Sequence, residues 1–195
     1  VEDNTTASAK AALSGLGEAI LTRVTSLSMD LHGPFEKAAK DVLDETRIVF
    51  DPFHVVKLAN EAMEQVRREE IAIHQRLDDP KGATILKKAR YSLLTAASRQ
   101  KDWAKQKVAY IGEWFANTAE AYRLKEILRL YRQCASEQDA RDHLQQWIAM
   151  TKTSPLDPMR RLAKTVENHL EGIVRVFRLG VTNAAAESLN ARIQA

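Results

Sequence analysis

The sequence predicts a mainly α-helical protein with a small parallel β element. Its 195 residues include seven Gly and five Pro, too few for the many turns of an all-β fold. Long stretches are rich in Ala, Leu, Glu, Lys, Arg and Gln, which favour helix. Two short apolar runs are separated by a helical segment, and strands connected in that way are parallel neighbours.

The N-terminal part of the sequence holds the predicted β element. Its boundaries follow from helical spacing of apolar residues, from β-branched runs, and from breaks at Gly33-Pro34 and Pro52. The predicted elements are a helix over 5–21, a strand over 24–29, a helix over 35–43, a strand over 46–50 and a helix over 55–77. Two parallel strands are too few to be stable alone, so further strands precede them or the helices supply the core.

The rest of the sequence predicts only helices. A turn at residues 78–82 separates them from the β element, and Thr182 or Asn183 caps the last of them. The predicted helices cover about 83–95, 102–133, 137–150 and 157–177, followed by a final helix after Asn183.

Composition excludes some classes of function. The net charge of +3 permits nucleic-acid binding without requiring it. A single cysteine, Cys134, excludes an internal disulfide and a cysteine-based zinc site, which fits a reducing cytosol. No run approaches the ~18 apolar residues of a membrane span, and the start is polar and lacks Met, so we expect a piece of a longer cytoplasmic protein.

Three acids are candidates for metal chemistry. Asp30 and Asp51 end the two predicted strands, and Glu187 lies in the last predicted helix. Carboxyl ends of parallel strands are where α/β sheets build sites, and carboxylates suit Mg²⁺. The alternatives are that Asp30 and Asp51 cap the following turn or helix, and that Glu187 is a solvated helical acid.

Histidine and basic residues give weaker indications. His54 is a ligand, a phosphate contact or a helix-start residue, and the last interpretation is preferred. Basic residues interleave with the aromatic residues Tyr91, Trp103, Tyr110 and Trp114, a pattern that suits a nucleic-acid surface. The alternative is a solvated helix face with aromatic residues beneath it. The possible DNA contacts are Lys57, Arg67, Arg68, Lys87, Lys88 and Arg90.

Several strings resemble those of DDE-type insertion-sequence transposases of the ISL type, in the same order over nearly the whole chain. The most characteristic are Phe50-Asp51-x-Phe53-His54 and Thr182-Asn183-Ala184-x-x-Glu187. Ser28-Met29-Asp30-x-x-Gly33-Pro34-Phe35 resembles the motif that carries the second acid of the catalytic triad. Ser188 departs from the family pattern, which has Gly after the triad Glu.

The resemblance implies a truncated ribonuclease H-like α/β fold with a large all-helical insertion. The two predicted strands would be the fourth and fifth of that fold. Residues 1–78 would form the partial core, residues 79–179 the helical insertion, and residues 180–195 the last catalytic-core helix. The zinc-binding and helix-turn-helix regions of the family have no counterpart in these residues.

The resemblance also implies the site. Asp30 and Glu187 would be the second and third acids of the triad and would bind Mg²⁺ or Mn²⁺, whereas the first acid has no counterpart here. Four further residues would lie near the site, namely Asp51, His54, Asn183 and Asn190.

The implied reaction is cleavage of DNA at transposon ends and joining to target DNA, at the bacterial nucleoid. Two metal ions would activate the attacking oxygen and stabilise the leaving 3′ oxygen. With one acid missing, we expect residues 1–195 to bind metal weakly and not to cut DNA. A bare strand edge at residues 24–29 would favour self-association. The alternatives are a non-catalytic helical DNA-binding or dimerisation module and, less favoured, a helical metal-dependent hydrolase.

Overall fold

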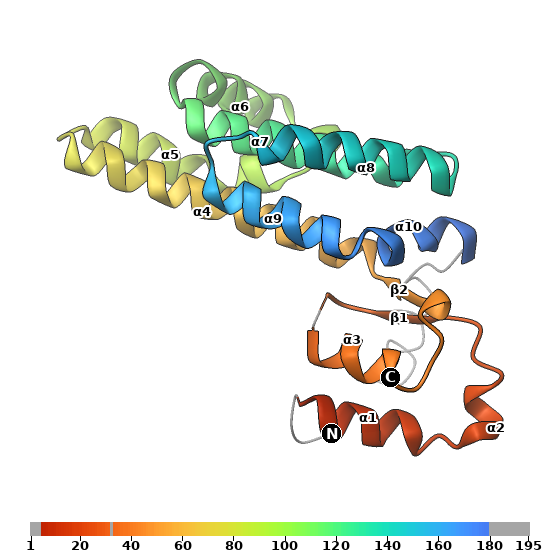
Figure 1. The fold of residues 1–195 in the computed structure, drawn as a ribbon. Helices are drawn as coiled ribbons and strands as arrows, with labels where there is room; N and C mark the ends of the chain where they lie inside the picture. Colours follow the sequence, from red (N-terminus) through yellow and green to blue (C-terminus); the bar gives the residue numbers. More distant parts are fainter. Residues whose placement is uncertain (1–4, 32, 180–195) are drawn as a thin grey trace, which may run out of the picture. The chain divides into compact units, whose positions relative to one another are not determined.

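The computed structural model describes residues 5–31 and 33–179. Within them the chain is mainly helical and contains two short strands that pair in parallel, which confirms the predicted mainly α-helical class with a small parallel β element. The chain forms two compact units (Figure 1). The first contains the described residues of 1–55, 135–141 and 169–195, and the second contains residues 56–134 and 142–168.

The first unit begins with two helices where the sequence predicted one. Helix α1 spans Thr6–Ser14 and the short α2 spans Glu18–Leu21. The side chains of Thr5 and Ser8 form a capping box at the start of α1. Gly17, directly before α2, adopts a positive φ of 79°, which is incompatible with a continuous right-handed helix and which glycine adopts without strain. The predicted continuous helix over 5–21 is therefore wrong.

The sheet consists of β1 (Leu27–Met29) and β2 (Ile48–Phe50). They pair in parallel, with Met29 opposite Phe50. Both strands are shorter than predicted. Helix α3 (Gly33–Lys40) connects them, and a 3-10 turn, η1 (Glu45–Arg47), replaces the first part of the predicted second strand.

Helix α10 (Leu170–Leu179) covers β2 in the same unit. The Arg175 guanidinium donates hydrogen bonds to the backbone carbonyls of Glu45 and Ile48. A Cβ atom at Gly172 would lie 2.5 Å from the Phe50 ring. Only glycine therefore allows the helix to approach the strand this closely.

We expect the chain to self-associate through the outer edge of β1. In the part of the chain that the structure describes, β1 pairs with β2 alone, and unpaired strand edges favour pairing with another chain. We expect light scattering to show growth in mean mass with concentration, and Ser26→Pro to reduce it because proline removes a backbone N–H. Ser26→Ala, which keeps the N–H, is the control. A constant monomer mass, or no difference between the two variants, would contradict the prediction.

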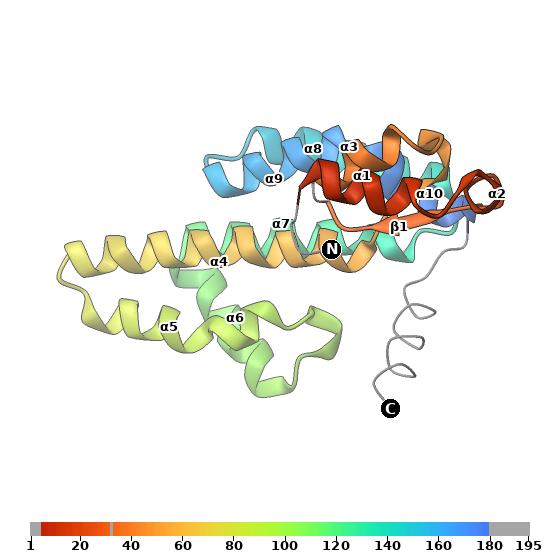
Figure 2. The same ribbon diagram turned by 90° about the horizontal axis from the view of Figure 1, so that it is seen from below.

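The second unit is a set of packed helices (Figures 1 and 2). Its longest helix, α4, spans Pro52–Arg76 and forms an antiparallel hairpin with α5 (Pro80–Leu94). The other elements are η2 (Ala97–Arg99), α6 (Asp102–Trp114), α7 (Ala116–Arg129), η3 (Leu130–Gln133), α8 (Glu137–Lys152) and α9 (Asp157–Asn168). No helix among the described residues is long and apolar enough to cross a membrane.

Two long predicted helices are each divided in two. The predicted helix over 102–133 is interrupted at Phe115, whose φ of −132° and ψ of 78° are not helical. The break lets α7 pack on α6, whereas an unbroken helix of that length would extend for about 48 Å. The predicted helix over 157–177 is likewise interrupted, so that α9 ends at Asn168 and α10 begins at Leu170. The unbroken helices over 102–133 and 157–177 are therefore wrong.

Several helix ends in the second unit are capped by side chains from other helices. The buried Glu70 carboxylate of α4 accepts hydrogen bonds from the backbone N–H groups of Asn117 and Thr118, in the first turn of α7. The His143 imidazole Nε2 on α8 lies 2.8 Å from the Ile127 carbonyl, in the last turn of α7. Such caps satisfy the backbone groups that a helix leaves unpaired at its ends. They fix how the helices of this unit dock.

Candidate active site

Asp30 directly follows β1 and is half-buried. The backbone N–H of Asp51 donates to the Met29 carbonyl at 2.9 Å, so the sheet pairing continues to the residues beside both acids. Asp30 itself makes no hydrogen bond or ion pair with any other residue that the structure describes. The two predicted strand-end acids therefore follow neighbouring strands at the same sheet edge, and the Asp30 carboxylate is not used to hold the described fold.

Asp51 has a structural role at the start of α4. Asp51 is 4% exposed, and its Oδ1 accepts a hydrogen bond from the backbone N–H of Phe53 at 2.9 Å. Its Oδ2 lies 2.9 Å from His54 Nδ1. A carboxylate in this position caps the helix and interacts favourably with the positive end of the helix dipole. The capping interpretation of Asp51, and the helix-start interpretation of His54, fit this geometry.

The C-terminal part of the predicted site lies outside the described residues. This applies to Asn183, Glu187 and Asn190. Within residues 5–31 and 33–179, no group of three or more His, Cys, Asp or Glu side chains could hold a metal ion. Asp30 and Glu187 as metal ligands stay a prediction.

The predicted DNA contacts differ in their exposure. Lys57, Arg68, Lys87, Lys88 and Arg90 are exposed. Arg67, by contrast, is buried, at 5% exposure. Its guanidinium donates to Glu64 at 2.6 and 2.7 Å and to the Leu86 carbonyl at 2.9 Å. Arg67 therefore joins α4 to α5, and its hydrogen-bonding groups face this helix pair.

Glu64 is the acidic centre of an arginine cluster between α4 and α5. Besides Arg67, its carboxylate contacts Arg68 at 3.1 Å and Arg90 at 3.2 Å. Burial alone would raise the pKa of Glu64, but hydrogen bonds and charge from these arginines outweigh it and lower the pKa. Glu64 was not among the predicted site residues, although its i,i+3 and i,i+4 spacing to Arg67 and Arg68 is visible in the sequence.

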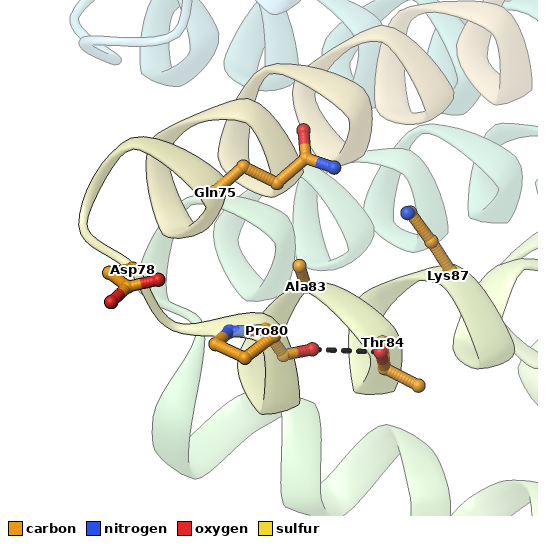
Figure 3. Close-up of a pocket in the computed structure, with 6 residues that line it drawn as sticks. All are labelled: Gln75, Asp78, Pro80, Ala83, Thr84 and Lys87. Carbon is orange, nitrogen blue, oxygen red and sulfur yellow. Dashed lines mark hydrogen bonds between the residues drawn. The ribbon is translucent and has the colours of Figure 1, made fainter.

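A pocket at the α4–α5 turn is visible in Figure 3. It is lined by Gln75, Asp78, Pro80, Ala83, Thr84 and Lys87. The Thr84 hydroxyl donates to the Pro80 carbonyl within α5, at 2.7 Å. Asp78 and Lys87 bring opposite charges to the pocket, so it lacks the concentrated positive charge of a phosphate site.

Comparison with known protein families gives one match. The model of the ISL3-type DDE transposase family, described as transposase, matches residues 1–195. Comparisons with curated proteins and with solved structures gave no match. The family match covers the whole chain and agrees with the resemblance in the sequence.

Proposed function

We propose a reaction for this chain from the premise that it belongs to the ISL3-type DDE transposase family. Membership implies that the protein acts on DNA. The proposed reaction is metal-dependent cleavage of DNA strands at the ends of an insertion sequence, followed by their joining to target DNA. Asp30 and Glu187 are the proposed metal ligands.

The observation that carries the proposal is the position of Asp30. It follows a strand of a parallel pair, at the sheet edge where α/β folds build their sites. Its carboxylate is engaged by no other described residue, and carboxylate oxygens suit hard divalent cations. These features are those required of a metal ligand.

The proposed fold is a ribonuclease H-like α/β core. In it β1 and β2 would be the fourth and fifth strands, residues 79–179 the helical insertion, and residues 180–195 the helix that carries Glu187. The parallel pairing of β1 with β2 supports this assignment. Residues 1–78 would form the rest of the core present in this chain.

The proposed chemistry assigns separate tasks to the residues. When bound at this site, Mg²⁺ or Mn²⁺ would supply positive charge beside the phosphate. Asp30 and Glu187 would hold it. Asp51 and His54 fix the start of α4 next to this edge, and Asn183 and Asn190 would lie on the same helix as Glu187. With two of three acids, we expect residues 1–195 alone to bind metal weakly and not to cleave DNA.

Metal binding tests the proposal without requiring cleavage. We expect electron paramagnetic resonance to detect bound Mn²⁺, and Asp30→Asn and Glu187→Gln each to weaken binding by about tenfold, or about 1.4 kcal/mol. Glu61→Gln, which removes an exposed acid of α4, is the matched control. Equal affinities in all three variants would refute the ligand assignment. Mg²⁺-dependent DNA nicking by the chain, abolished by Glu187→Gln, would refute the expected inactivity.

A further inference from the structure

Four large aromatic side chains on α5 and α6 are exposed to solvent. Tyr91 lies on α5, and Trp103, Tyr110 and Trp114 lie on α6, with exposures between 45% and 74%. The three on α6 are separated by seven and four residues, a spacing that places them on one helix face. Lys107 occupies the same face at i+4 from Trp103. Large exposed aromatic side chains gathered on one helix face are a feature of binding sites.

The same two helices concentrate the positive charge of the chain. Residues 80–114 contain eight Lys and Arg against two acids, a net charge of +6. The rest of the chain has a net charge of −3. All eight basic side chains are exposed or half-exposed. The modest overall charge therefore conceals a strongly basic segment, which attracts polyanions.

Direct contacts place basic groups among the rings. The Lys107 ammonium lies 5.3 Å from the centre of the Trp103 ring and donates to the Lys88 carbonyl of α5 at 3.3 Å. The Arg90 guanidinium lies 5.7 Å from the centre of the Tyr91 ring. Lys107 thus links the aromatic face of α6 to α5, and packed helices of the same unit carry both aromatic and basic groups.

We propose that this aromatic–basic face binds single-stranded DNA. The face is defined as Lys88, Tyr91, Trp103, Lys107, Tyr110 and Trp114. Unpaired bases stack on the rings, and the lysines contact the phosphates. Trp103 and Trp114 are 11 residues apart, or about 16 Å along the helix, which is room for several nucleotides.

The combination of rings and charge favours this ligand over others. Double-stranded DNA would use the lysines but keeps its bases stacked inside the duplex, so four exposed rings would contribute little. A second copy of the chain would place two segments of charge +6 against each other. The proposal goes beyond the DNA-cleaving function, because binding here needs neither a metal ion nor Asp30.

Tryptophan fluorescence tests the proposal directly. The chain has three tryptophans, of which Trp103 and Trp114 lie on the face and Trp147 is buried in the core. The titration uses the 195-residue chain, a 20-nucleotide single strand of mixed sequence and a chelator that removes divalent metals. We expect the strand to quench the emission of Trp103 and Trp114, and the duplex of the same sequence to quench it much less.

Variants separate stacking from charge. Trp103→Ala and Trp114→Ala should each weaken single-strand binding about tenfold, because each removes a ring on which a base stacks. Lys88→Ala should reduce the slope of the logarithm of the binding constant against the logarithm of the salt concentration by nearly one, because one counterion fewer is released on binding. The matched controls are Leu77→Ala, an exposed apolar residue, and Lys164→Ala, an exposed lysine of α9. Both should bind as the unaltered chain does.

Three results would overturn the proposal. One is equal binding of single strand and duplex with no effect of the tryptophan variants, which would indicate backbone contacts alone. Another is a concentration-dependent dimer that Trp103→Ala abolishes, which would make the face a contact between copies. The third is absence of single-strand binding. Loss of Mn²⁺ binding by Asp30→Asn leaves this measurement unchanged, so the two proposals fail separately.

Discussion

Lys125→Ala should lower the free energy of unfolding by about 2–5 kcal/mol, the loss typical of truncating a large buried side chain to alanine. The Lys125 side chain is fully buried in α7. Its ammonium lies 2.9 Å from the Glu126 carboxylate and 4.6 Å from the centre of the Tyr122 ring. Alanine would leave a cavity and would remove the positive charge beside Glu126.

Lys125 also caps a helix. Its ammonium donates to the Leu93 carbonyl, in the last turn of α5. The Gln100 amide donates to the Ser92 carbonyl at 2.8 Å and to the Tyr122 hydroxyl at 2.9 Å. Two buried side chains thus satisfy carbonyl groups at the end of α5, and the removal of either leaves a buried acceptor unpaired.

Two further variants separate the loss of side-chain volume from the loss of the charge and cap. Chemical denaturation measures the free energy of unfolding of each. Lys125→Met keeps the volume and should cost less than Lys125→Ala. Lys164→Ala, on an exposed part of α9, should change stability by less than about 0.5 kcal/mol. A loss in Lys125→Ala as small as that of the Lys164 variant would contradict the capping role.

The pH dependence gives an independent check on Lys125. Burial lowers its pKa below the ordinary value of 10.5, against the opposing charge of Glu126. The unfolded chain then binds more protons, so stability rises as the pH increases through the folded pKa toward 10.5. Lys125→Met should remove this rise. Burial raises the pKa of Tyr122, which acts with the opposite sign above its ordinary value of 10.0, so the comparison is made below that pH.

Elements whose sequence pattern lies within a single segment could be predicted from the sequence. For α4, the apolar residues Val56, Ala59, Met63 and Val66 recur at helical spacing, and all four are buried. The parallel pairing of β1 with β2 followed from the connecting segment alone, because a helical crossover returns the chain in the same direction. The expectation that Asp30 and Asp51 follow adjacent strands required no more than this.

Interruptions of long helices could not be predicted in the same way. The nearest glycine, Gly112, lies inside α6 and does not mark the break at Phe115. Phe115 is buried, with its ring centre 5.1 Å from that of His74. The break depends on packing between α4 and a segment about 40 residues away. By contrast, Gly15 and Gly17 are visible signals against a continuous helix over 5–21, although the apolar periodicity continues past them.

Contacts with residues that are distant in the sequence also determine which charged residues have a structural role. Arg67 and Arg68 are adjacent in the sequence and look equally suited to contact DNA. On the helix they point about 100° apart, so that Arg67 is buried against α5 while Arg68 stays exposed. Glu70 and Lys125 cap the ends of helices from distant positions, and no local pattern indicates this. Charge alone therefore did not separate a solvated face from a buried contact.

Glu64→Gln should destabilise the second unit by about 3 kcal/mol, because the buried guanidinium of Arg67 would lose its anionic partner. The glutamine keeps the size of the side chain and one acceptor oxygen, so the loss reports mainly the charge. Arg68 and Arg90 are much more exposed than Arg67 and should contribute little. Thermal or denaturant unfolding measures the change.

The matched control for Glu64→Gln is Glu69→Gln, which removes an exposed acid from the same helix and should cost less than about 0.5 kcal/mol. The free energy of unfolding at acidic pH gives the second measurement. Because the pKa of Glu64 is lowered in the folded chain, its contribution is present above the ordinary value of 4.5 and is lost as the pH falls through the folded pKa. Glu64→Gln should therefore flatten the fall in stability below pH 4.5, whereas Glu69→Gln should not. Parallel curves for the two variants would mean that the arginine cluster does not hold α4 and α5 together through charge.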